Sequence, residues 1–158
     1  MSLRAQLSFL LFALLAATAS ASDLKIVRVF TGWREAASFK RISEYFDGKE
    51  NTGGQLVLRT HAEQRTGFYF LVRVANLSAA VVAKLELELI LPTSAKPITY
   101  TFPVALPPGT SVLNLGLTGS DWPDKKANPV AWKIFVRSPD GTLLASESSY
   151  LWEKPTAK

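Results

Sequence analysis

The chain contains no cysteine among its 158 residues. A domain without disulfides must be held together by its hydrophobic core alone. The absence also excludes a thiol nucleophile, a thiolate metal site and a thiol redox role. Many bacterial periplasmic proteins share this composition, whereas small secreted eukaryotic domains usually contain cysteine.

Long apolar runs are scarce as well, and the densest one lies at the N-terminus. Residues 5–17 are almost entirely apolar, follow the positive charge of Arg4 and lead into small residues. These features predict a secretory signal peptide at 1–21, cleaved after Ala21 or, as a second choice, after Ala19. An uncleaved membrane anchor is the alternative, but the run is short for a span of roughly 20 residues. No cysteine follows either predicted cleavage site, so a lipid-anchored lipoprotein is excluded.

Acidic residues are fewer than basic ones, which gives a net charge of +5. The basic residues are scattered, and only Lys40-Arg41 and Lys125-Lys126 are adjacent pairs. Nucleic-acid binding would need a basic stripe with interleaved aromatics, and none is evident. No second apolar run is long enough to cross a membrane. We therefore expect an exported protein, periplasmic or secreted, without a nucleic-acid partner or a membrane span after cleavage.

The strongest pattern in the chain is an alternation of apolar and polar residues over 82–104. Its two runs, 82–91 and 98–104, are separated by a turn that contains two prolines. Such a period of two predicts a hairpin of half-buried antiparallel strands. Weaker alternation predicts further strands, at 23–31, 55–61, 67–75, 110–118, 130–138 and 142–152. The link at 62–66 is short and polar, so 55–61 and 67–75 are predicted to pair as a hairpin.

Residues 34–46 follow a different period. Ala36, Phe39, Ile42 and Phe46 recur every three or four residues, which predicts one short N-terminal helix or a pair of helical turns. No βαβ alternation is present, so a parallel sheet is not expected. The pattern therefore predicts an all-β fold, an antiparallel β-sandwich of about eight strands with one short N-terminal helix. We expect the chain to form a single domain at 22–153, followed by a flexible polar tail at 154–158.

The closing segment of the chain resembles a known class of hairpin. Trp132 lies inside one strand, S-P-D-G follows at 138–141, and L-L-A-S-E-S-S-Y-L-W occupies 143–152. This arrangement resembles the closing hairpins of bacterial immunoglobulin-like or fibronectin type III-like sandwiches. The Cys…Trp…Cys arrangement of immunoglobulin domains proper is absent. The resemblance implies a fold that is immunoglobulin-like in the broad sense, and a shared fold does not transfer function.

Residues suited to catalysis are few and poorly placed. His61 is the one histidine, and no serine lies in a G-x-S-x-G motif, so we interpret it as a surface histidine at a strand end. Glu86 and Glu88 lie on one strand face, roughly 6.5–7 Å apart at their Cα atoms. A carboxylate pair can serve glycoside hydrolysis, but any solvated strand face has this composition. The sequence therefore predicts that the protein is not an enzyme.

The loop at 119–129 and the junction near residue 33 contain the candidate binding residues. A loop tryptophan beside charged residues can anchor a partner protein or a sugar ring. The candidates are Trp33, Arg34, Tyr69, Asp121, Trp122, Lys125 and Lys126. The alternative for Trp122 is a plug that folds back on the sandwich end. Two aspartates followed by two lysines are a poor calcium site, so no metal and no cofactor are predicted.

These patterns favour a non-catalytic binding or accessory domain in the bacterial cell envelope. Its partner would be a protein, in the envelope or the extracellular space, bound through an aromatic anchor or through strand addition at an open sheet edge. The alternative is a carbohydrate-binding module that uses exposed aromatics and takes a glycan. A hydrolase is the least favoured hypothesis.

Overall fold

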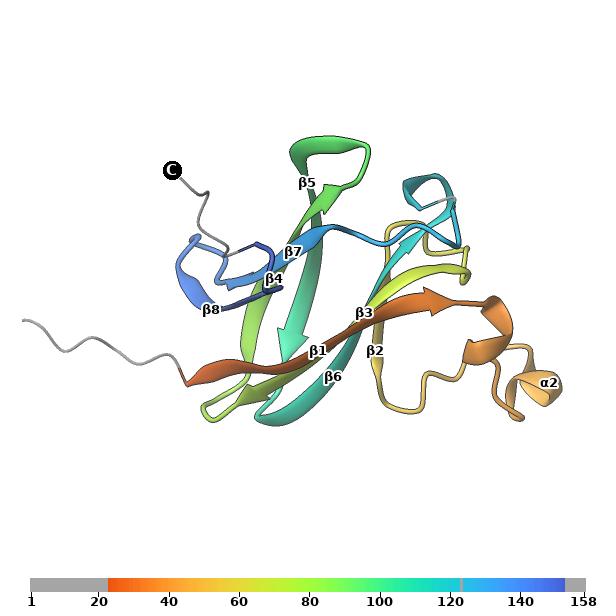
Figure 1. Ribbon diagram of the computed structural model, residues 1–158. Helices are drawn as coiled ribbons and strands as arrows, with labels where there is room; N and C mark the ends of the chain where they lie inside the picture. Colours follow the sequence, from red (N-terminus) through yellow and green to blue (C-terminus); the bar gives the residue numbers. More distant parts are fainter. Residues whose placement is uncertain (1–22, 123, 153–158) are drawn as a thin grey trace, which may run out of the picture.

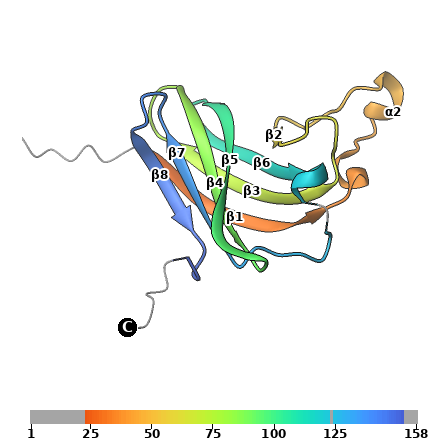
Figure 2. The same cartoon turned by 90° about the horizontal axis from the view of Figure 1, so that it is seen from above.

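The computed structural model describes residues 23–122 and 124–152. Within this part of the chain, eight strands form two four-stranded sheets that pack face to face (Figures 1 and 2). The first sheet has the order β1 (Leu24–Arg34), β3 (Gly67–Asn76), β6 (Gly109–Thr118) and β2 (Leu56–Arg59). The second sheet has the order β5 (Ser94–Leu106), β4 (Val81–Leu91), β7 (Ala131–Arg137) and β8 (Leu143–Ser148). The all-β, sandwich-like architecture is confirmed.

The core lies between the two sheets and consists of the alternate apolar residues of each strand. Strand β3 contributes Phe68, Phe70, Val72 and Val74, all at most 1% exposed. The facing leucines of β4 and β6 are completely buried, at positions 85, 87 and 89 and at positions 113, 115 and 117. Because successive side chains of a strand point to opposite faces, the residues between them form the outer faces of the sandwich.

The hairpin predicted at 82–104 is confirmed. Strands β4 and β5 pair antiparallel, with Leu85 opposite Phe102 and Leu87 opposite Tyr100. Strand β4 also pairs with β7, so it is an inner strand of the second sheet. Glu86 lies on the outer face, opposite the core leucines, as its alternation predicted.

The hairpin predicted between 55–61 and 67–75 is wrong. Strand β3 pairs along its whole length with β1 on one side and with β6 on the other, so it has no free edge for β2. Strand β2 instead pairs parallel with the outer edge of β6. The expectation of purely antiparallel pairing is therefore corrected at this edge, where a four-residue strand lies beside β6.

The single short N-terminal helix is not confirmed. Strand β1 continues through Arg34, and two separate turns follow it: the 3₁₀ turn η1 (Ala36–Phe39) and the α-helical turn α2 (Glu44–Asp47). Lys40, with extended backbone angles, separates the two turns. The break lets Phe39 fold down onto the first sheet while α2 projects away from it (Figure 1).

Two sequence predictions lie outside the described residues: the signal peptide at 1–21 and the tail at 154–158. Of the helices in the described part of the chain, none has the length and apolar character that crossing a membrane would require.

Candidate functional site

A polar cluster lies on the outer face of the first sheet, where the segment between β1 and β2 crosses it. Phe39 of η1 is buried there, with its ring 4.7 Å from the ring of Tyr69 on β3. The guanidinium groups of Arg34 and Arg59 lie 4.4 and 5.0 Å from the same Phe39 ring. Cations are attracted to the face of an aromatic ring, so Phe39 holds both arginines in place.

Arg59 is largely buried in this cluster, with only 6% of its side chain exposed. It donates two hydrogen bonds to the carboxylate of Glu50, at 2.9 and 2.6 Å, and one from Nε to the Tyr69 hydroxyl at 2.9 Å. The hydroxyl donates in turn to the backbone carbonyl of Arg65 at 2.6 Å. The hydrogen bonds from Arg59 lower the pKa of Glu50, and burial raises the pKa of Tyr69. At neutral pH Glu50 is therefore ionised and Tyr69 is neutral.

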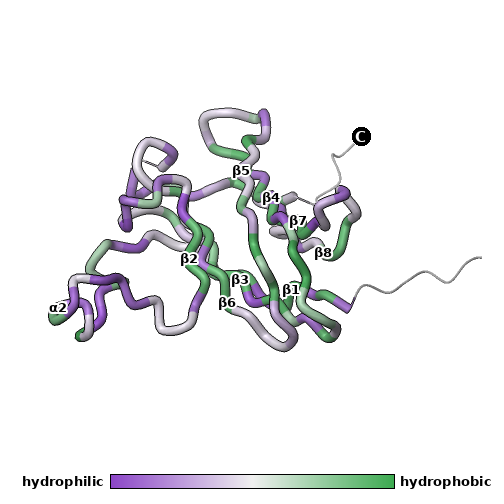
Figure 3. Tube along the Cα trace, turned by 180° about the vertical axis from the view of Figure 1, so that it is seen from behind, coloured by the Kyte–Doolittle hydropathy of each residue, from purple (hydrophilic) through white to green (hydrophobic). Residues whose placement is uncertain are grey.

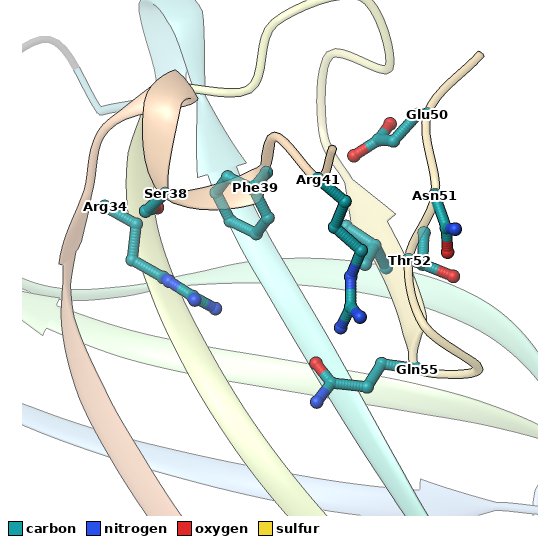
Figure 4. Close-up of a pocket in the computed structure, with 9 residues that line it drawn as sticks. Arg34, Ser38, Phe39, Arg41, Glu50, Asn51, Thr52 and Gln55 are labelled. Carbon is teal, nitrogen blue, oxygen red and sulfur yellow. The ribbon is translucent and has the colours of Figure 1, made fainter. Parts of the chain in front are cut away.

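A hollow of about 130 Å³ opens beside this network, between the η1 turn and the segment that leads into β2. Figure 4 shows the guanidinium groups of Arg34 and Arg41 and the amide of Gln55 directed toward the same space. Arg34 donates to the Asn114 side-chain oxygen at 2.9 Å, and Asn114 donates to the Gln55 oxygen at 3.0 Å. This chain of hydrogen bonds engages the acceptor of Gln55, so its NH₂ group remains as a donor at the hollow.

The charges around the hollow are not balanced. Arg65 pairs with Glu44 at 2.5 Å, and Arg59 pairs with Glu50 at 2.6 Å. In the described ranges, neither Arg34 nor Arg41 has a carboxylate within salt-bridge distance. The Glu50 carboxylate also lines the hollow, but Arg59 already holds it. The guanidinium groups of Arg34 and Arg41 and an amide donor therefore face one small space without a carboxylate of their own, and this arrangement suits an oxyanion such as a carboxylate.

Gly53 permits the placement of Arg41. Its backbone has a φ of +63°, and a Cβ atom there would lie 2.1 Å from the Nη2 atom of Arg41. Glycine both adopts this left-handed conformation at no steric cost and leaves room for the guanidinium group.

The structure separates the predicted site residues into two groups. Arg34 and Tyr69 belong to the polar cluster, where Arg34 lines the hollow and Tyr69 is 2% exposed beneath Phe39.

Trp33 belongs to the second group, away from the hollow. It points to the other face of β1 and donates from Nε1 to Glu35 at 3.0 Å. Lys125 donates to the same Glu35 oxygen at 2.7 Å.

The remaining predicted residues lie around the loop that follows β6. Trp122 is 4% exposed and stacks on Phe68 at 4.8 Å, which matches its interpretation as a plug on the sandwich end. Lys126 is exposed and its backbone N–H donates to Asp124. Asp121 lies 3.2 Å from His61.

Sequence reasoning missed the other residues of the polar cluster, chiefly Arg41, Gln55, Arg59 and Asn114. The available signals were weak. Arg41 belongs to one of the two adjacent basic pairs, and Asn114 occupies the strand face opposite the alternating leucines of β6, as an ordinary polar residue of a solvated face would. Arg59 and Gln55 have no pattern that distinguishes them from ordinary strand-face residues.

Ser120, His61 and Asp121 lie together but do not form a catalytic triad. The Ser120 hydroxyl and the Asp121 carboxylate lie 3.3 and 3.2 Å from the same ring atom, Nε2 of His61. A triad needs the serine on one ring nitrogen and the carboxylate on the other, so that the base is oriented as it takes the proton. No group of three or more potential metal ligands occurs among the residues the structure describes.

The pair Glu86 and Glu88 also lacks the features of a glycosidase site. Glu86 accepts hydrogen bonds from Lys84 and Arg137, both at 2.8 Å. These bonds, with the one from Lys84 as the larger effect, lower the pKa of Glu86. A general acid needs a raised pKa, so Glu86 is suited to pairing across the sheet and not to proton donation.

The comparisons with known proteins add no family. No family model matches the chain, and no curated protein matches it. One solved structure, a provisionally assigned β-galactosidase from Bacteroides fragilis, is 13% identical over 80% of this chain, with a TM-score of 0.39. The chain covers only 17% of the length of that protein. At this level of similarity nothing about that protein is carried over to this chain.

Proposed function

We propose that the protein is a non-catalytic, exported binding domain of the bacterial cell envelope, immunoglobulin-like in the broad sense. It recognises an acidic group of a partner protein through the hollow that Arg34 and Arg41 line. The observation that carries this proposal is that both guanidinium groups face the hollow without a carboxylate partner in the described part of the chain, while Arg59 and Arg65 beside them are paired.

The size of the hollow supports a partner protein over a free small molecule. Small-molecule pockets usually enclose about 300–1,000 Å³, and this hollow encloses about 130 Å³. It can take a carboxylate group, and the rest of the ligand then lies outside on the protein surface. The carbohydrate-binding alternative has less support because two of its three candidate aromatics, Tyr69 and Trp122, are buried.

Arginine side-chain NMR tests whether the hollow binds a carboxylate. We expect N-acetyl-glutamate amide to shift the Nε–Hε signals of Arg34 and Arg41, and N-acetyl-glutamine amide to have no effect. Arg41→Gln removes the response, since Arg41 is exposed and its loss leaves the buried network intact. Lys126→Gln is the matched control, because it removes one exposed charge elsewhere. Shifts of the same size in Arg41→Gln refute the site.

Site-specific cross-linking tests the class of partner. A photo-reactive p-benzoylphenylalanine replaces Thr52 at the rim of the hollow, in cells of the source organism. The proposal expects an adduct whose added mass consists of peptides of a second protein in mass spectrometry, and this adduct disappears when Arg41→Gln is added. An adduct whose added mass is removed by glycosidases, with no second protein in it, overturns the protein partner in favour of an acidic glycan.

A further inference from the structure

The segment at residues 40–49, called the α2 tip below, exposes three large apolar side chains. Ile42, Tyr45 and Phe46 are 79%, 75% and 85% exposed. Figures 1 and 2 both show α2 as the part of the fold that projects farthest from the two sheets on its side. Figure 3 shows apolar positions at this projection next to hydrophilic ones. The apolar side chains therefore have no role in the core of this domain.

The three side chains share one side of a single helical turn. They are spaced three and four residues apart, and the backbone N–H of Tyr45 bonds to the carbonyl of Ile42 at 3.1 Å, so the turn already includes Ile42. Gly48, with a φ of 68°, ends the turn. One turn is too short for the row of anchors over two turns with which a helix docks in a protein groove. It presents a small apolar wedge.

Basic residues flank the wedge along the chain. Lys40 and Lys49 lie at the two ends of the α2 tip, and the Nζ atom of Lys40 lies 5.8 Å from the ring centre of Tyr45. The guanidinium group of Arg41 is directed toward the hollow and is not counted among these flanks (Figure 4). Of the two acids in the tip, Glu44 is neutralised by Arg65 at 2.5 Å, which leaves Asp47 as its one acid without an arginine or lysine partner in the described residues. The tip therefore combines exposed aromatic and aliphatic groups with a positive charge.

We propose that the α2 tip docks on an anionic lipid bilayer. Apolar side chains enter the boundary between headgroups and acyl chains, while surrounding lysines and arginines meet anionic headgroups. Tyr45 suits this depth because its ring is apolar and its hydroxyl is polar. The charge complementarity between the basic flanks and an anionic surface selects this occupant. The inference is independent of the ligand that the hollow takes.

Co-sedimentation with lipid vesicles tests the proposal, using the chain from Ser22 on so that the apolar N-terminal run cannot itself bind lipid. We expect binding to vesicles of equal parts phosphatidylglycerol and phosphatidylcholine, and much weaker binding to phosphatidylcholine alone. Phe46→Ser weakens partitioning about ten-fold, because it removes a large apolar contact with the membrane. Lys49→Gln weakens it about five-fold, the effect of one basic side chain near an anionic surface.

Leu77→Ser is the matched control, because Leu77 is 83% exposed at the opposite end of β3. It should bind anionic vesicles as the unaltered chain does. The proposal is overturned if the unaltered chain does not sediment with anionic vesicles, if it binds both vesicle types equally, or if Phe46→Ser and Leu77→Ser behave alike. Sedimentation velocity without vesicles covers a further outcome: a dimer that Phe46→Ser dissociates, together with no vesicle binding, overturns the proposal in favour of a second copy as the occupant.

Discussion

Replacing Arg59 with methionine should destabilise the fold strongly, because Arg59 connects the first sheet to the segment that covers it. The substitution removes two hydrogen bonds to Glu50 and one to the Tyr69 hydroxyl, while methionine retains most of the apolar stem. Breaking a buried ion pair by removing one partner costs about 3–5 kcal/mol. Glu50 keeps 24% of its side chain exposed and can recover part of its hydration. We therefore expect a loss of about 3 kcal/mol, which lowers Tm by about 10 °C.

Urea denaturation at pH 7 measures the loss, with Arg73→Met as the control. Arg73 is exposed on the outer face of β3, and no salt bridge involves it in the described residues, so its replacement should change the free energy of unfolding by less than about 0.5 kcal/mol. A double-mutant cycle with Glu50→Gln tests the same pair. The double variant should lose less free energy of unfolding than the two single variants lose together, because Glu50→Gln removes the carboxylate that Arg59→Met leaves unpaired.

The pH dependence of this loss follows from the lowered pKa of Glu50. A carboxyl group whose pKa is depressed by folding stabilises the folded state above its ordinary value, here 4.5, and this contribution is lost as the pH falls through the folded value. The difference in free energy of unfolding between the unaltered chain and Arg59→Met should therefore have its full size at pH 7 and should become smaller below about pH 4.5. A difference that is the same at pH 7 and pH 3, or no larger than that of Arg73→Met, refutes the reasoning.

Two further substitutions test the packing around this cluster and at the sandwich end. Trp122→Ala should cost about 3–5 kcal/mol in urea denaturation, since the side chain is buried against Phe68; a cost below about 1 kcal/mol would show that Trp122 is not part of the core. Gly116→Ala should cost about 1–3 kcal/mol because the new Cβ atom would lie 2.4 Å from the Tyr69 ring. Gly32→Ala serves as its control, because a Cβ atom there would meet no atom of residues 23–122 or 124–152 within 4 Å, so equal losses for the two glycine variants would contradict this account.

The local sequence pattern was sufficient to predict a strand where that strand has one buried face. The alternating leucines of β4 indicated its core face correctly, because a period of two leaves one consistent face for the interior. For β3 and β6 the alternation predicted the strands, and the structure shows which face of each is buried. The tryptophan at position 122 remained open between anchor and plug in the sequence. Only its packing on Phe68 distinguishes the two, because both place a tryptophan in a loop.

Sheet order and the polar cluster required the tertiary structure. Nothing local to β2 indicates that β6 lies between it and β3, since the pairing depends on which edges the longer strands leave open. The apolar residues of 34–46 do recur at helical spacing, but they fall in two separate turns. Phe39 is therefore buried on the sheet, whereas Phe46 is exposed to solvent.

Apolar periodicity alone was enough to predict an all-β chain with a leucine-rich core, because this periodicity is a local property of the chain. The convergence of Arg34, Arg41, Arg59 and Asn114 depends on the tertiary structure, because long-range strand pairing brings distant parts of the chain together. Arg34 and Asn114, which share a hydrogen bond, are 80 residues apart in the sequence.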